Sequence, residues 1–113
     1  MGLEADAVPY YEKAIQIGLN ETNAMGAFIG LGSTYRALGQ YDKSEIVFEK
    51  GIEQFPENKA MKTFYAMTLY NLGKHHEAME ILLTSIARST NDSEILSYKR
   101  AIEFYADKLD QIW

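Results

Sequence analysis

The sequence has no cysteine and only two prolines among its 113 residues. Without cysteine, disulfide bridges, thiolate nucleophiles and cysteine-ligated zinc are excluded, and the composition is compatible with a reducing compartment. No apolar run approaches the roughly 18 residues that a membrane-spanning helix requires. The first residues also lack the basic and apolar regions of a signal peptide. We therefore expect a cytoplasmic protein with no membrane partner.

A basic surface is missing as well. The formal net charge is −5 at pH 7. The acidic excess lies in residues 1–57, which hold nine acidic and four basic side chains, whereas residues 58–113 hold seven of each. Binding to a phosphate backbone requires a basic stripe, so we expect no nucleic-acid partner. The acidic residues fit solvated outer helix faces, and a basic ligand remains open.

The residues for catalysis or metal binding do not come together in the sequence. His75 and His76 are the only histidines. On a helix they point about 100° apart, so they do not hold one ion together. We interpret His75 as a half-buried packing residue, because it takes the place that Tyr41 holds 34 residues earlier. Phosphate-binding, nucleophile-elbow and metalloprotease motifs are also missing. We predict no enzyme activity, no cofactor and no metal site.

What the sequence does contain is an internal period of 34 residues. Residues 31–41 align with residues 65–75, and the alignment continues downstream. A period of this length indicates stacked helix-turn-helix units, each of which buries its apolar face against its neighbours. No segment alternates as a strand would. The period therefore predicts a single all-α domain.

Caps and apolar spacing predict six helices. Asp6, Asp42 and Asp92 are expected to be N-caps. Gly39 and Gly73 are expected to end the second and fourth helices in the left-handed conformation. The predicted helices span residues 7–19, 24–38, 42–55, 57–72, 76–89 and 92–111.

The first full unit resembles the tetratricopeptide repeat. It contains Phe28-x-x-Leu31-Gly32-x-x-Tyr35-x-x-x-Gly39-x-Tyr41-x-x-Ser44-x-x-x-Phe48-x-x-Gly51-x-x-x-x-Pro56. The second unit departs from the pattern by placing Lys62 at the first large position and Thr90 at the terminal proline position. The resemblance implies an α-α superhelix of antiparallel helix pairs. Its parts are a half repeat at 7–19, repeats at 25–58 and 59–91, and a capping helix at 92–113.

The half repeat has no first helix to pack against. Pro9 is expected in the first turn of its helix, where a missing N–H is tolerated. Either a helix upstream of Met1 or another subunit should cover the open side. Apolar side chains also remain at the far end, and a two-fold homodimer would bury both sets. The side chains concerned are Tyr10, Tyr11, Ile15, Ile17, Leu19, Phe104 and Trp113.

The resemblance implies a protein-protein interaction module, acting as a scaffold or adaptor, with a concave groove lined by the first helix of each unit. The carried-over groove residues are Ile29, Ser33, Arg36, Thr63, Met67, Tyr70 and Asn71, with the small residues Gly26, Ala37 and Ala60 beside them. This lining suits an apolar peptide or an amphipathic helix. The carboxylate-clamp subfamily needs Lys and Asn where this chain has Ile29 and Ser33, so we reject that assignment. Two alternatives stay open: several of these residues pack inside, or the domain is a structural homo-oligomer with no separate ligand.

Overall fold

The computed structural model describes the backbone of residues 2–18 and 20–112, and the side chains from residue 6 onward in these ranges. Leu19, at the predicted end of the first helix, and Trp113 lie outside the described residues. No strand occurs in the described ranges, and the all-α prediction is confirmed. The helices are α1 (Gly2–Gln16), α2 (Glu21–Ala37), α3 (Tyr41–Gln54), α4 (Lys59–Asn71), α5 (His75–Ser89), α6 (Ser93–Ser97) and α7 (Lys99–Tyr105).

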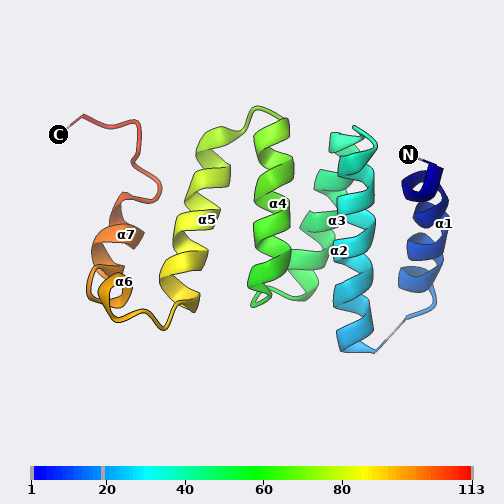
Figure 1. Ribbon diagram of the computed structural model, residues 1–113, viewed down its shortest axis with the longest axis horizontal. Helices are drawn as coiled ribbons and strands as arrows, with labels where there is room; N and C mark the ends of the chain where they lie inside the picture. Colours follow the sequence, from blue (N-terminus) through cyan, green and yellow to red (C-terminus); the bar gives the residue numbers. More distant parts are fainter. Residues whose placement is uncertain (1, 19, 113) are drawn as a thin grey trace.

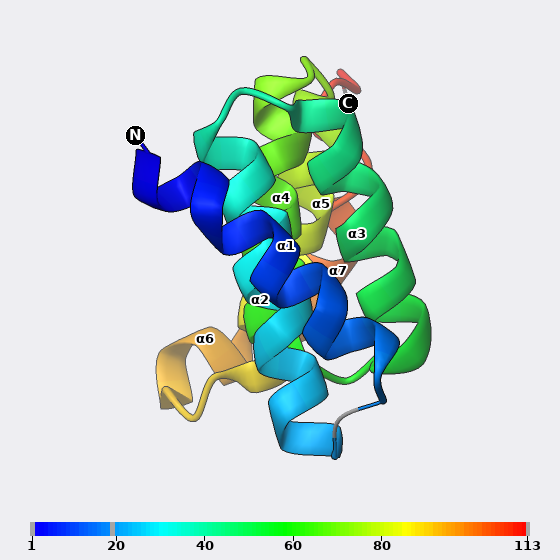
Figure 2. The same cartoon turned by 90° about the vertical axis from the view of Figure 1, so that its right-hand side faces the viewer.

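The helices stack in chain order along the longest dimension of a body measuring 48 × 30 × 21 Å (Figure 1). In the end-on view of Figure 2, α2, α4 and α6 lie on one side of the array, and α3 and α5 lie on the other. We call these two surfaces the α2/α4 face and the α3/α5 face. The α2/α4 face is turned toward the viewer in Figure 1. This arrangement of adjacent helix pairs is the predicted helical-repeat architecture.

Glycines form the turns after α2 and α4, as the sequence predicted. Gly39 has φ +76° and Gly73 has φ +78°, which confirms that both take the left-handed conformation after their helices. That region is strained for residues with a Cβ atom. Asp92 is the predicted N-cap of α6, because its side chain accepts a hydrogen bond from the Ile95 N–H at 3.0 Å. The prediction for Asp42 was wrong, since α3 already begins at Tyr41 and Asp42 lies in its first turn.

The first helix differs from its prediction at both ends. It begins at Gly2 instead of residue 7, so Asp6 is not its N-cap and Pro9 lies inside the helix. A proline removes one backbone hydrogen bond from the helix interior, and the residues before it still continue the helix. The helix ends at Gln16, and Gly18 follows with φ +75°. Gly18 therefore belongs to the turn that follows the helix.

The long final helix was also predicted wrongly. It is broken at Tyr98, and α7 ends at Tyr105 instead of continuing to residue 111. Side chains explain both interruptions. The Ser97 hydroxyl donates to the Glu94 carbonyl at 2.7 Å, while the Tyr98 N–H turns to the Ile95 carbonyl. Likewise, the Lys108 ammonium donates to the Phe104 carbonyl at 2.9 Å, and the Lys108 N–H bonds to Tyr105. Such local bonds compete with the helix.

Small residues allow the helices to cross closely. A Cβ atom on Gly32 would lie 2.5 Å from the Phe48 ring, and one on Gly51 would lie 2.5 Å from the Met61 sulfur. Phe48 and Met61 are fully buried. The core between α2, α3 and α4 is therefore built on direct contact between aromatic or sulfur-containing side chains and helix backbone.

A buried hydroxyl pair links the same three helices. The Ser44 Oγ atom of α3 donates to the Gly32 carbonyl of α2 at 2.7 Å and lies 2.8 Å from the Thr68 Oγ1 atom of α4. Ser44 and Thr68 are both completely buried. Since a carbonyl can only accept, the Ser44 hydrogen is used on Gly32, and Thr68 donates to Ser44.

Candidate functional site

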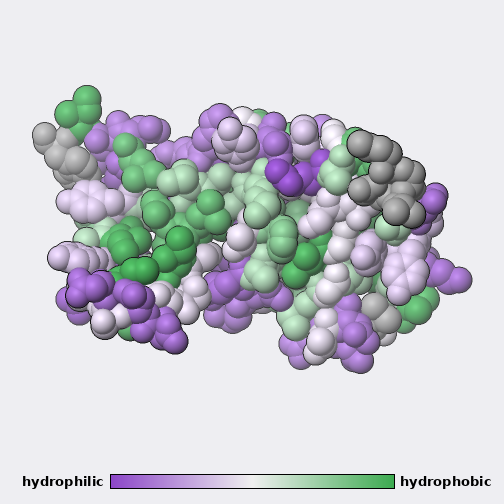
Figure 3. Space-filling model, viewed as in Figure 1, coloured by the Kyte–Doolittle hydropathy of each residue, from purple (hydrophilic) through white to green (hydrophobic). Residues whose placement is uncertain are grey.

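The α2/α4 face exposes a row of large apolar side chains on α4. Phe64, Met67 and Tyr70 are 37%, 39% and 63% exposed. They follow one another at intervals of three residues, which places them along one side of the helix. Figure 3 shows hydrophobic residues gathered in a band across the middle of this face, over α4, α5 and α7. The band is an exposed apolar surface that extends over more than one helix (Figure 3).

Two of the predicted groove residues join neighbouring units. The Arg36 Nε atom on α2 donates to the Asn71 Oδ1 atom on α4 at 2.6 Å. Both residues are half-buried. The bond connects α2 to α4 at the edge of the α2/α4 face. The arginine therefore already has a hydrogen-bond partner before any ligand binds.

Three other predicted residues lie deeper in the face. Ile29 is half-buried against the core cluster of Phe28, Phe48 and Met61. The Thr63 hydroxyl donates to the Lys59 carbonyl of its own helix at 2.8 Å. The Ser33 Oγ atom is enclosed and has no hydrogen-bond partner within the described part of the chain. Of the seven predicted residues, only Met67 and Tyr70 are therefore prominently exposed.

The small residues predicted beside the groove leave shallow places on the α2/α4 face. Gly26, Ala37 and Ala60 are exposed. Gly26 lines a hollow of about 340 Å³ between α1 and α2, beside the rings of Tyr10 and Tyr11. Those two rings meet edge to face, with centroids 5.4 Å apart. A ligand on the α2/α4 face can therefore approach the backbone of α2 closely at Gly26.

Tyr70 is held by a neighbouring ring. Its centroid lies 4.8 Å from that of His75, with 33° between the planes. His75 is exposed, so the interpretation that it is half-buried was wrong. It lies at the start of α5, where its ring packs on Tyr70 from outside instead of entering the core. His76 pairs with Asp110 at 3.2 Å.

Sequence reasoning missed Phe64. The family positions that were carried over do not include it, but its spacing from Met67 places it in the same row. Within the described ranges, no three His, Asp or Glu side chains gather as a metal site would require. No helix in those ranges is both long and apolar enough to span a bilayer.

The comparisons with known proteins agree with this architecture. The family profile described as "Tetratrico peptide repeat" matches residues 1–109. The chain belongs to the tetratricopeptide repeat family, whose members generally mediate protein-protein interactions as non-catalytic scaffolds.

Two known proteins have sequences similar to that of this chain. Superkiller protein 3 from Saccharomyces cerevisiae is 29% identical over 79 residues, which cover 70% of this chain but 5% of the yeast protein. The TPR repeat-containing protein MJ1428 from Methanocaldococcus jannaschii is 34% identical over 90 residues, covering 71% of this chain and 15% of the archaeal protein. The chain thus spans a small part of the length of both relatives.

Proposed function

We propose that the chain is a scaffold or adaptor module that binds an apolar peptide or an amphipathic helix along the α2/α4 face. The observation that supports this most directly is the exposed row of Phe64, Met67 and Tyr70. Burial of apolar area contributes about 25 cal/mol per Å², so a ligand that covers this row gains binding free energy. Methionine adapts its shape to different ligands. We further propose a cytoplasmic location, which the cysteine-free composition favours.

The polar groups around the row would orient the ligand. Arg36 and Asn71 lie at its edge, already bonded to each other, and can offer their remaining donors without new ordering of the side chains. In this proposal the apolar row supplies affinity, and Arg36 and Asn71 fix the position of the ligand along the face.

Site-directed photocrosslinking tests the proposal. A benzophenone amino acid replaces Met67 on the α2/α4 face, and in a separate variant it replaces Ile46 on α3, which is 52% exposed. We expect adducts with defined proteins from the Met67 position and not from the Ile46 position. Tyr70→Ala and Phe64→Glu should abolish these adducts, whereas Ile46→Glu should leave them intact. Equal labelling from both positions, or adducts that survive both substitutions, would contradict the proposal.

A second candidate is self-association, which a specific observation favours. Apolar side chains are exposed at both ends of the array: Tyr10 at 72% on α1, Ile17 at 66% in the turn that follows α1, and Leu96 at 44% on α6. Burying them between copies would produce a two-fold homodimer without a separate ligand. Light scattering coupled to size exclusion decides between the candidates. A dimer mass that Ile17→Glu converts to a monomer supports self-association, and a monomer mass at tens of micromolar refutes it.

A further inference from the structure

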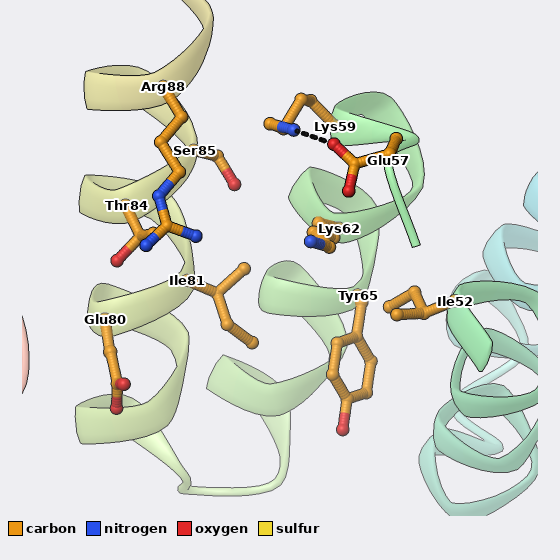
Figure 4. A pocket seen from close by; sticks show the side chains of 10 residues that line it. All are labelled: Ile52, Glu57, Lys59, Lys62, Tyr65, Glu80, Ile81, Thr84, Ser85 and Arg88. Atoms are coloured by element: carbon orange, nitrogen blue, oxygen red, sulfur yellow. Dashed lines mark ion pairs between the residues drawn. The ribbon is translucent and has the colours of Figure 1, made fainter. Parts of the chain in front are cut away.

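The α3/α5 face carries a cavity of about 290 Å³ that is separate from the row on α4. It lies over α4, between α3 and α5 (Figure 4). Ile52 of α3 and Ile81 of α5 flank the Tyr65 ring of α4, and all three are half-buried. These side chains give the cavity an apolar floor wide enough for one large apolar side chain.

Basic side chains line one end of this cavity. In Figure 4 the Lys62 ammonium on α4 and the Arg88 guanidinium on α5 face the same space from opposite walls. Arg88 forms an ion pair with Glu103 at 3.6 Å through one of its two Nη atoms, so its other N–H donors remain for a ligand. Lys62 forms no ion pair with any residue that the structure describes. An anionic group entering between them would therefore meet two donors with spare capacity.

The acidic side chains of the lining do not neutralise this end. Glu57 is paired with Lys59 at 3.6 Å. Glu80 lies eight residues before Arg88 on α5, about 12 Å along the helix axis. Figure 4 shows its carboxylate at the opposite end of the cavity. The cavity is therefore polarised, with its positive end at Lys62 and Arg88.

The preceding unit has the same hollow with different chemistry. There a cavity of about 260 Å³ is lined by Phe28, Leu31 and Val47. These residues correspond, 34 positions later, to Lys62, Tyr65 and Ile81. The position of the buried Phe28 is thus occupied by a cation in the second unit only. The preceding hollow is also lined by Glu12 and Lys50, but Lys50 corresponds to Thr84 in the second unit, so the two hollows carry their basic residues at different positions.

We propose that this cavity binds a peptide segment of a partner protein in which an acidic residue neighbours a large apolar residue. The apolar side chain covers Ile52, Tyr65 and Ile81, and the carboxylate lies between Lys62 and Arg88. The apolar part contributes affinity through burial, and the carboxylate selects acidic over neutral segments. The surface lies opposite the α2/α4 face, so the chain can hold two partners at once.

Methyl NMR of the complete chain tests this inference with a matched pair of peptides, N-acetyl-Phe-Glu-amide and N-acetyl-Phe-Gln-amide. The methyl signals of Ile52 and Ile81 report on the cavity, and that of Met67 reports on the α2/α4 face. We expect the Glu peptide to shift the two isoleucine signals and to bind roughly two- to fivefold more tightly than the Gln peptide, as a partly exposed ion pair allows. Lys62→Met should remove that preference.

Lys50→Met provides the control, because Lys50 lines the corresponding hollow of the preceding unit. The preference for the Glu peptide should persist in this variant. Equal affinity for both peptides, an unchanged preference in Lys62→Met, or shifts confined to Met67 would each overturn the inference. The last outcome would leave the proposed function of the α2/α4 face intact, so the two proposals fail separately.

Discussion

The buried hydroxyl pair on α3 and α4 yields a stability prediction with a defined order. Ser44→Ala removes the acceptor to which Thr68 donates, and both positions are completely buried. The Thr68 hydroxyl then has no partner at Ser44, and the Gly32 carbonyl loses a donor. An unsatisfied buried group costs about 1–3 kcal/mol. We place Ser44→Ala at about 1–2 kcal/mol, because a threonine in a helix can turn its hydroxyl toward its own backbone.

Substitution of the partner residue, Thr68, should lower the free energy of unfolding by less than Ser44→Ala does. Thr68→Val keeps the shape of the side chain and leaves the Ser44 hydroxyl bonded to Gly32, so only one hydrogen bond of about 0.5–1.5 kcal/mol is lost. The double variant leaves neither hydroxyl unsatisfied. It should therefore be no less stable than Ser44→Ala alone, which corresponds to a coupling energy of about 1 kcal/mol.

Urea unfolding followed by far-UV circular dichroism measures all four proteins of this cycle, with the slope of the transition checked for constancy. Strict additivity of the two single substitutions would refute the coupling. A larger loss for Thr68→Val than for Ser44→Ala would refute the direction of donation that the carbonyl of Gly32 imposes.

Three further predictions concern backbone packing and pH. Gly32→Ala should lower stability by about 1–3 kcal/mol in thermal unfolding, because its Cβ would lie 2.5 Å from the Phe48 ring; an unchanged midpoint would contradict the close crossing. Gly39→Ala, at φ +76°, should destabilise by about 1 kcal/mol or more, whereas the helical Gly26, which has open space around it, should gain about 0.5–1 kcal/mol on the same change. Burial, followed by the charges of neighbouring glutamates, raises the pKa of Tyr65 above 10. The folded chain therefore holds this proton more tightly than the unfolded chain, so its stabilising effect is complete below pH 10 and declines as pH rises beyond it. Tyr65→Phe should flatten the alkaline decline in midpoint, and an identical pH profile would count against this account.

The repeat architecture was predictable because it depends on features that recur along the chain. Gly39 and Gly73 lie 34 residues apart and end equivalent helices with nearly the same φ. Gly32 meets the Phe48 ring at the crossing where the period requires a small residue. A pattern that repeats is supported by each copy, so single exceptions do not obscure it.

The chain ends and the site were less predictable because single side-chain contacts decide them. The bonds of Ser97 and Lys108 to nearby carbonyls shorten the last helices, and apolar spacing does not report them. Similarly, the family positions named Arg36 and Asn71 as groove residues, but their bond to each other depends on how two units meet. Lys62 was recognised as a departure from the repeat pattern, yet its place in a cavity required the positions of α3 and α5.

The break at Tyr98 also sets how firmly the last part of the chain is folded. α6 and α7 contain five and seven residues, and neither has a buried residue. Isolated helices shorter than about 12–15 residues are marginal in water, so α7 depends on its packing against α5, and α6 depends on its packing against α7. In an array where each helix pair contacts mainly its neighbours, such an end opens without unfolding the rest. Amide hydrogen exchange should therefore be fastest in α6 and α7 and slowest around Leu69 in the buried part of α4, which makes opening of this molecule a graded process that starts at one end.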